Sequence, residues 1–471
     1  MTPVETLRGQ SVALFGLGGS GLSTARALVA GGAEVAAWDD SAAARERASA
    51  VGVALVDLSH ADWRSFRVFV LAPGVPLTHP KPHWTVNLAD EAGVPVIGDI
   101  ELFVRERGVR APDASFVAIT GTNGKSTTTA LIAHVLKEAG REVAMGGNIG
   151  VPVLDLPPPA PGRTHVVECS SYQIDLAPSL APSAGLLINI TPDHLDRHGD
   201  LAGYAAIKER LVANAEVALV GVDDERCREI YARLKARAGA PRVIAVSGTE
   251  SPLADIWVSE HRVMARGEAA PAADLARARA LRGAHNGQNA AFAYAAARAL
   301  GVERDHIARA FETFPGLAHR MEEVGRLDRV LFINDSKATN ADAAEKALLS
   351  FHDIHWILGG RPKSGGVEPL RPLFPRVAKA YLIGEASDEF ARTLTGVVPF
   401  ERYGALTAAI EAAAEDAAQS TAREPVVLLS PACASFDQFA NFEARGDAFR
   451  THVVKWLEQR VAAGTRMQRG R

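Results

Sequence analysis

Cysteine is scarce in this chain, which has only three among 471 residues: Cys169, Cys227 and Cys433. They lie far apart and form no CxxC pair. This excludes the spacings of a disulfide framework and of a cysteine-rich zinc site. We therefore expect three buried thiols in a protein of the reducing cytoplasm.

Long hydrophobic runs and an excess of positive charge are missing as well. No run of about 20 apolar residues is available to span a membrane, and residues 1–21 lack the basic and apolar segments of a signal peptide. The formal net charge of −4 is typical neither of a nucleic-acid-binding surface nor of a surface that binds anionic membranes. These absences predict a cytoplasmic protein with no membrane insertion and no nucleic-acid partner.

Short apolar segments alternate with helical patterns along the chain, as is typical of parallel α/β domains. At about 100 to 200 residues per domain, the length indicates three domains. Breaks in the apolar pattern near 105–112 and 313–319 place the boundaries, so we predict domains at 1–108, 109–316 and 317–471. A long helix is expected at 437–457, and strands at 11–15, 34–38, 68–71, 94–97, 116–120, 165–168, 185–190, 217–221, 330–334, 355–358, 380–383 and 425–429.

The segment 117–132 begins as an apolar strand, passes through a loop bracketed by Gly121 and Gly124, and continues as a helix. Such a loop turns backbone N–H groups toward a phosphate, and the helix N-terminus adds a positive dipole. Lys125 is positioned to reach the β- and γ-phosphates, and the Ser126 hydroxyl to bind Mg²⁺. Ile119 stands where the general P-loop pattern has its first glycine, so this loop is a shorter variant. A glycine turn can precede a helix by chance, but Lys-Ser-Thr in register favours a chain that uses ATP.

A second glycine-rich turn, GLGGSG at 16–21, also lies between an expected strand and helix. It satisfies GxGxxG, and Asp39 and Asp40 end the next strand about 20 residues later. One alternative is therefore an oxidoreductase whose acidic pair holds the ribose of NAD. The same turn suits any diphosphate nucleotide, or only a structural connection. The predicted fold class is α/β with three domains: Rossmann-like N-terminal, central P-loop ATPase-like, and Rossmann-like C-terminal.

Two polar segments follow strands of the predicted central domain. Glu168 ends one strand, and TPDHLDRH at 191–198 follows another. A carboxylate at a strand end beside a P-loop is well placed to bind Mg²⁺, and His194 to hold a second metal ion or a substrate oxygen. We interpret His198 as part of an exposed helix-capping turn, because its spacing from His194 without a further ligand does not indicate zinc.

The segment NDSKATN at 334–340 lies where a strand passes into a helix. Because parallel strands present ligand-binding groups at their carboxyl ends, Asp335 is a candidate acceptor for ribose hydroxyl groups or nearby cationic groups. Lys337 is a candidate to neutralise phosphate or carboxylate charge. An N-cap turn is the alternative interpretation, and it leaves Lys337 unexplained.

Five motifs together resemble the Mur ligase family, the ATP-dependent amide-forming enzymes of bacterial peptidoglycan precursor synthesis. They are GTNGKST at 121–127, TPDHLDRH at 191–198, HN at 285–286, HR at 319–320 and NDSKATN at 334–340. Several independent motifs in matching order are far more specific than any one of them. Further segments at 16–21, 71–76, 98–103 and 429–439 are most similar to the family members that add D-glutamate to UDP-N-acetylmuramoyl-L-alanine.

This resemblance implies a UDP-sugar instead of NAD on the N-terminal domain. Ser20 and Gly21 are expected near its diphosphate, Asp39 and Asp40 near its uracil, and Asn148 at its muramoyl group. For the incoming glutamate the resemblance points to five residues of the C-terminal domain. These are Lys337, Thr339, Lys363, Ser430 and Phe436.

For ATP the resemblance implies Asn286 at the adenine, with Arg320 and Asp335 approaching from the C-terminal domain. It also implies two Mg²⁺ ions. Lys208 matches a lysine that family members carry as a carbamate formed with CO₂, an anion able to bind magnesium; without the resemblance it is interpreted as a solvated helix lysine. The expected phosphate-loop residues are Gly121, Thr122, Asn123, Gly124, Lys125, Ser126 and Thr127, and the expected metal ligands are Ser126, Glu168, His194 and Lys208.

The implied reaction joins D-glutamate to UDP-N-acetylmuramoyl-L-alanine through an acyl phosphate and releases ADP and phosphate. Small molecules are the expected partners of a monomeric enzyme. A catalytically silent nucleotide-binding module is the other alternative, and the retention of polar site residues weighs against it. The expected catalytic residues are Lys125, His194, Lys208 and Lys337.

Overall fold

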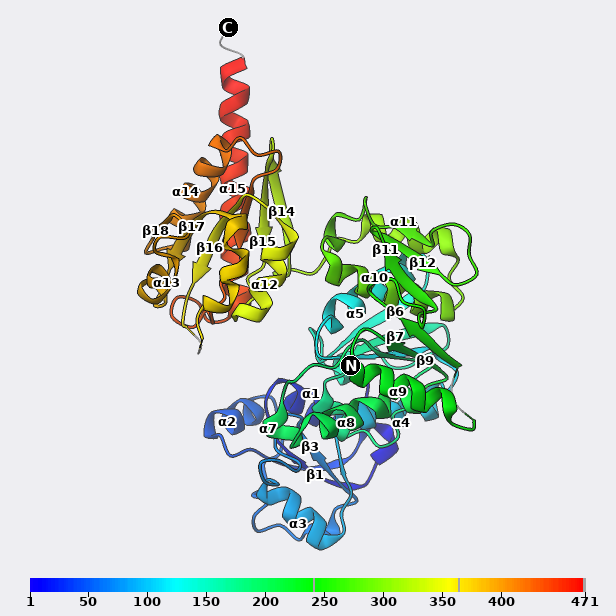
Figure 1. Ribbon diagram of the computed structural model, residues 1–471. Helices are drawn as coiled ribbons and strands as arrows, with labels where there is room; N and C mark the ends of the chain where they lie inside the picture. The colour runs from blue at the N-terminus through cyan, green and yellow to red at the C-terminus, as the bar shows by residue number, and fades with distance from the viewer. Residues whose placement is uncertain (240–241, 363–364, 469–471) are drawn as a thin grey trace. The chain divides into compact units, whose positions relative to one another are not determined.

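A computed structural model describes residues 1–239, 242–362 and 365–468, with 462–468 described by backbone alone. The chain divides into two compact units (Figure 1). The first unit consists of Met1–Arg277 with Asn286–Thr313, and the second of Ala278–His285 with Phe314–Arg471. Two sheets lie in the first unit and one in the second. The predicted α/β class with parallel-rich sheets is confirmed.

The N-terminal sheet has four parallel strands in the order β2-β1-β3-β4. Alternate residues of β1 and β3 point to opposite faces, because successive side chains of a strand alternate. One face packs against α1 and α4, and the other against α3 and the short 3₁₀ helix Trp63–Ser65. The elements are β1 (Ser11–Phe15), α1 (Gly19–Gly31), β2 (Glu34–Trp38), α2 (Ala42–Ala50), β3 (Val68–Leu71), α3 (Trp84–Ala92), β4 (Val96–Ile97) and α4 (Asp99–Arg110).

The central sheet has nine strands in the order β13-β12-β11-β10-β9-β8-β5-β7-β6. The strands from β6 to β11 run parallel, whereas β12 and β13 are antiparallel additions. Helices α5 and α11 pack together on one side, and α8 and α9 cover the other (Figure 1). The strands are β5 (Phe116–Thr120), β6 (Glu142–Gly147), β7 (Arg163–Glu168), β8 (Ala184–Leu187), β9 (Val217–Gly221), β10 (Arg242–Val246), β11 (Ile256–Ser259), β12 (Arg262–Ala265) and β13 (Ala273–Asp274).

One hydrophobic core joins these two sheets into a single unit. It runs from α1 and α4 into α8 and strands β5, β7 and β8. Helix α4 ends at Arg110 and β5 begins at Phe116, so residues 111–115 connect the two elements. The helices of this part are α5 (Lys125–Glu138), α6 (Ser171–Asp175), α7 (Leu195–His198), α8 (Leu201–Ala213), α9 (Glu225–Ala236), α10 (Ala284–Ala299) and α11 (Arg304–Thr313).

The third sheet has the order β14-β15-β19-β16-β17-β18 and is parallel except for β14. Helices α12 and α13 contribute to the core on one face, and α14 and α15 to the core on the other. The elements are β14 (Glu322–Leu327), β15 (Val330–Asn334), α12 (Ala341–Ser350), β16 (Ile354–Gly359), β17 (Val377–Ile383), α13 (Ser387–Leu394), β18 (Phe400–Arg402), α14 (Leu406–Gln419), β19 (Val426–Leu429) and α15 (Phe442–Gln468).

The last helix begins later than predicted. Asp437 and Gln438 stand outside it because their side chains bond other loops: Asp437 accepts from the amide of Glu385, and Gln438 donates to the carbonyl of Gly404. Across the part of the chain that the structure describes, no helix combines the length and apolar character needed to cross a membrane.

Candidate functional site

The phosphate loop predicted at 121–127 lies at the carboxyl end of β5, and α5 starts at Lys125. The Lys125 ammonium donates to the carbonyls of Gly121 and Thr122 at 2.9 and 2.8 Å, so it lies over the loop. Asn189, which follows the neighbouring strand β8, fixes the loop. Its carbonyl accepts from the Thr122 amide at 2.9 Å, and its side-chain oxygen accepts from the Asn123 amide at 2.8 Å. Asn189 was not predicted, because an asparagine after a strand carries no distinctive signal.

Gly124 requires glycine for two reasons. Its φ is +82°, and a Cβ there would collide with the side-chain oxygen of Asn289. That oxygen also accepts from Thr128 Oγ1 at 3.2 Å, while the Asn289 amide donates to Asn286 at 3.0 Å. Asn286 and Asn289 are both buried. The predicted adenine residue is therefore linked to the phosphate loop through Asn289, which lies one helical turn further along α10.

Glu168 lies at the end of β7, directly beside β5, where its register partner is Ile119. Its side chain is 2% exposed. Asn148, predicted at the muramoyl group, donates to one carboxylate oxygen at 2.8 Å, and the other oxygen is buried with no hydrogen-bond partner. A buried, unpartnered carboxylate oxygen beside a phosphate loop fits a hard cation such as Mg²⁺. Ser126, the second predicted oxygen ligand, is also buried.

Lys208 is 1% exposed, which corrects its interpretation as a solvated lysine. Its ammonium donates to Thr120 Oγ1 at 3.0 Å and to the Gly121 carbonyl at 2.9 Å, directly beneath the phosphate loop. Burial, and next the charge of Lys125, hold the pKa of Lys208 well below its usual range. A lysine on α8 is thus part of the same site as the loop, and its amine is more readily neutral than that of a surface lysine.

The two histidines of 191–198 differ in exposure. His198 is buried: its Nε2 lies 2.9 Å from Ser171 Oγ, its ring stacks on Tyr172, and burial lowers its pKa to about 4. The interpretation of His198 as an exposed capping residue is therefore wrong. His194 is exposed, with a φ of +53°, and lies 3.4 Å from Asp193 and beside Tyr172.

The residues around the turn at 16–21 differ from those around the phosphate loop. Asp39 accepts from the Leu17 amide at 2.6 Å and from the Ser41 amide at 2.8 Å, so this carboxylate holds the turn in shape. Asp40 is exposed and lies 3.2 Å from His83. Ser20 and Gly21 line a small hollow together with Asp99, a residue that was not predicted. Asp99 is buried and bonded to Gln173, and burial raises the pKa of its carboxyl group.

Two predicted residues of the second unit, Asp335 and Ser430, meet at the carboxyl ends of β15 and β19. Asp335 accepts from Ser430 Oγ at 2.9 Å and from the Met321 amide at 3.2 Å, and burial raises its pKa to about 7. Arg320 is close enough to oppose that rise electrostatically. The Lys337 ammonium lies 3.9 Å from the ring centroid of Phe442.

The other predicted glutamate residues differ in exposure. Thr339 is half-buried and Phe436 is 63% exposed, whereas Lys363 lies outside the described residues. Among the residues that are described, no three His, Cys, Asp or Glu side chains are grouped as a metal site. The predicted ligand set therefore depends on Glu168 together with the Ser126 hydroxyl, His194 and Lys208.

Comparisons with known proteins cover nearly the whole chain. A model of the Mur ligase middle domain matches residues 119–297, and a model of the Mur ligase glutamate ligase domain matches 319–433. A UDP-N-acetylmuramoylalanine--D-glutamate ligase of Mesorhizobium japonicum is 60% identical over 453 residues, which are 96% of this chain and 97% of that protein. Its counterpart in Nitrobacter hamburgensis is 60% identical over 459 residues, 96% and 98% of the two chains.

Solved structures support the fold alone. A UDP-N-acetylmuramate-alanine ligase of Thermotoga maritima superposes with a TM-score of 0.58 at 16% sequence identity, over 95% of this chain and 99% of that one. A UDP-N-acetylmuramoyl-L-alanyl-D-glutamate--2,6-diaminopimelate ligase gives 0.55 at 21% identity, over 78% and 88%.

Proposed function

The chain belongs to the Mur ligase family, and we propose that it joins D-glutamate to UDP-N-acetylmuramoyl-L-alanine at the expense of ATP. The amino acid and the UDP-sugar follow from the names of relatives that are 60% identical over 96% of the chain. Family membership leaves the oxidoreductase alternative without support. We further propose that the enzyme is a cytoplasmic monomer with domains at 1–108, 109–316 and 317–471.

One observation carries the ATP-dependent chemistry: a phosphate loop and an unpartnered, buried carboxylate oxygen lie at the ends of two neighbouring strands, β5 and β7. Glu168 and Ser126 would hold Mg²⁺ there, with His194 and a modified Lys208 as the further proposed ligands of two ions. When bound, Mg²⁺ neutralises phosphate charge and orients the reacting oxygens.

In the proposed reaction, a carboxylate oxygen of the alanine bonds to the γ-phosphorus of ATP as the bond to ADP breaks. The neutral amine of glutamate then bonds to the carbonyl carbon, the bond to phosphate breaks, and the nitrogen loses a proton. The protein acts mainly by positioning and by stabilising charge. Lys125 neutralises the phosphoryl oxygens, and Lys337 supports the negative charge that develops during transfer. Asn286 would hold the adenine, with Arg320 and Asp335 supporting the nucleotide.

The remaining substrate contacts are proposed as follows. Ser20 and Gly21 bind the diphosphate of the UDP-sugar, with Asp39 and Asp40 toward the uracil. Asn148 bonds the muramoyl group through the side chain that now donates to Glu168. The glutamate binds to Lys337, Thr339, Lys363, Ser430 and Phe436.

Lys208 is proposed to carry a carbamate. Its lowered pKa favours the neutral amine that reacts with CO₂, and the anion formed would be neutralised by the nearby charge of Lys125. Protein equilibrated with ¹³C-bicarbonate should give a carbamate carbonyl resonance that is absent from a Lys208→Met variant. An identical spectrum for the two proteins would refute the modification.

The function is tested by phosphate release from ATP, Mg²⁺ and UDP-N-acetylmuramoyl-L-alanine, with D-glutamate, L-glutamate, meso-diaminopimelate or no amino acid in parallel, and by mass analysis of the product. Release and a matching amide mass with D-glutamate alone are expected. Product with another amino acid would overturn the substrate but keep the ligase chemistry, and folded protein without turnover would support the silent-module alternative.

A further inference from the structure

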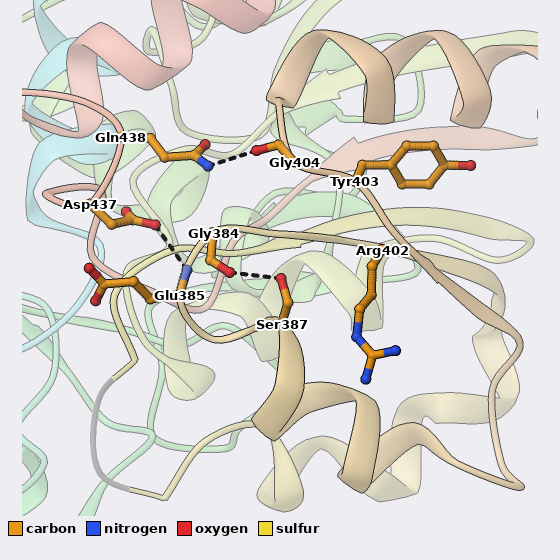
Figure 2. A pocket seen from close by; sticks show the side chains of 8 residues that line it. All are labelled: Gly384, Glu385, Ser387, Arg402, Tyr403, Gly404, Asp437 and Gln438. Carbon is orange, nitrogen blue, oxygen red and sulfur yellow. Dashed lines mark hydrogen bonds between the residues drawn. The ribbon is translucent and has the colours of Figure 1, made fainter.

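The second unit has two polar features at the carboxyl ends of its strands. They differ in whether all their polar groups have hydrogen-bond partners in the protein. The first is a hollow of about 450 Å³ beside the ends of β17 and β18 (Figure 2). Its polar groups already bond the protein: Asp437 accepts from the Glu385 amide and Gln438 donates to Gly404. Because these polar groups already have hydrogen-bond partners in the protein, they do not indicate a ligand.

The second feature is the guanidinium of Arg445, on α15. It is 1% exposed, and its hydrogen bonds within the described residues go to a hydroxyl and to carbonyls and not to a carboxylate. Burial lowers its pKa to about 10, so it remains charged at neutral pH. One of its nitrogens, Nη1, is buried with no hydrogen-bond partner. A buried charge without a carboxylate costs free energy, so the fold must gain something from its position.

The hydrogen bonds of Arg445 link two loops, and a third loop lies beside its side chain. Nε donates to Ser336 Oγ at 3.0 Å and Nη2 to the Ser336 carbonyl at 2.9 Å, in the loop after β15. Nη2 also donates to the Cys433 carbonyl at 3.1 Å, in the loop after β19. The third loop, after β16, lies beside Nη1 without a hydrogen bond to it: a Cβ on Gly360 would be 3.2 Å from Nη1 and 2.3 Å from the Ala434 carbonyl.

These are the three loops to which the amino-acid contacts are assigned. Lys337 is adjacent to Ser336, Ser430 and Phe436 flank Cys433, and Lys363 follows Gly360. A backbone bridge between Arg361 and Ala434 joins the second and third loops at 2.9 and 3.1 Å. A planar guanidinium suits this task, because its donors point in several fixed directions at once, whereas an ammonium is a point charge.

We propose that Arg445 is the positioning residue of the glutamate site, which fixes the loops after β15, β16 and β19 in one mutual arrangement. It acts through these loops and contacts neither ATP nor the UDP-sugar. The inference about the loops stands on the contacts of Arg445, and its link to glutamate rests on the proposed function.

The loop arrangement is tested without turnover, by hydrogen exchange of the full-length protein. Arg445→Lys keeps the charge but cannot make all the hydrogen bonds to Ser336 and Cys433 at once. Arg460→Lys is the matched control, because Arg460 lies on the same helix, pairs with Glu415 at the surface and lies over the ring of Trp456. We expect the amides of Arg361 and Ala434 to exchange at least about tenfold faster in Arg445→Lys, with strand β16 unchanged. Wild-type exchange at both amides in a folded variant would overturn the inference.

Kinetics then test the link to glutamate. In Arg445→Lys the KM for D-glutamate should rise about tenfold, while the KM values for ATP and the UDP-sugar change by less than about twofold. Arg460→Lys should match wild type in all three. Equal changes in the three KM values would mean a general structural role and would overturn the positioning role. If wild-type protein makes no amide, the proposed function fails, and the exchange result still decides the loop inference.

Discussion

Two glycine-rich turns connect a strand to a helix in the first unit, and their surroundings carry opposite charge. Carboxylates surround the turn at 16–21: Asp39 binds its backbone, and Asp99 lines the hollow beside it. Lysines surround the turn at 121–127, where Lys125 lies over the loop and Lys208 beneath it. The backbone geometry of both turns allows a phosphate to approach.

The charge of the side chains therefore distinguishes what the two turns can bind. A triphosphate is favoured beside the Lys125 ammonium and disfavoured beside the Asp39 carboxylate. The first turn suits a nucleoside, whose hydroxyl and ring N–H groups can donate to carboxylates, with a diphosphate that lies along the backbone. GxGxxG alone does not separate these cases, because it specifies the turn and not its neighbours.

Removal of the lysine from the second turn should give the largest effect. Lys125→Met is expected to reduce kcat for phosphate release roughly 10³-fold, because the phosphoryl charge then lacks its nearest cation. Calorimetry should show unchanged binding of the UDP-sugar, which uses the other turn. Lys137→Met, an exposed lysine in the last turn of the same helix, is the control. More than about a tenth of wild-type activity in Lys125→Met would contradict the comparison.

The backbone of the first turn is tested by an added methyl group. A Cβ on Gly21 would collide with the Gly16 carbonyl, whereas Gly18 has open space around it and an ordinary φ of −67°. Gly21→Ala should lower the free energy of unfolding by about 2 kcal/mol, and Gly18→Ala by less than about 0.5 kcal/mol. Thermal unfolding of both variants measures this difference. Equal midpoints would mean that the turn adapts and does not require the close approach.

Asp39→Asn tests whether the carboxylate shapes the first turn. The amide keeps one acceptor but turns an N–H group toward the Leu17 or Ser41 amide. The KM for the UDP-sugar should therefore rise about tenfold, with the KM for ATP unchanged. Asp57→Asn is the control, since Asp57 is exposed and its carboxylate accepts from the amide and hydroxyl of Ser59. A rise in the KM for ATP of the same size would show that the two turns are not independent.

The fold was predictable where buried strands form local apolar runs. Strands β1, β3, β5, β9 and β15 have the predicted bounds, because each is a short apolar run beside a turn signal. The antiparallel strands β12 and β14 were not predicted. Both contain charged or partly exposed residues, so their pairing depends on a neighbouring strand and not on their own pattern.

The motifs of the site were predictable from the sequence, but the burial and the contacts of its residues were not. The phosphate loop and Glu168 are recognisable from residue types that follow strands. The burial of Lys208 and His198 is not, because a lysine or histidine on a short helix has no local mark of burial. Asn289 and Arg445 were not predicted for the same reason, because only the loops that their side chains contact distinguish them.

The smallest effect concerns Asp99, beside the first turn. Burial raises its pKa, so the folded protein binds this proton more tightly than the unfolded chain does. The stability that the protonated group contributes is complete below the unfolded pKa of 3.8 and is lost as pH rises through the folded pKa. As the pH rises from about 3.8 into the neutral range, Asp99→Asn should therefore lose less stability than wild type. Melting midpoints across this range measure the difference, with the exposed Asp113→Asn as the control. Parallel curves for wild type and Asp99→Asn would mean that Asp99 is ionised in the folded protein, and the first turn would then be still less suited to a triphosphate than the second.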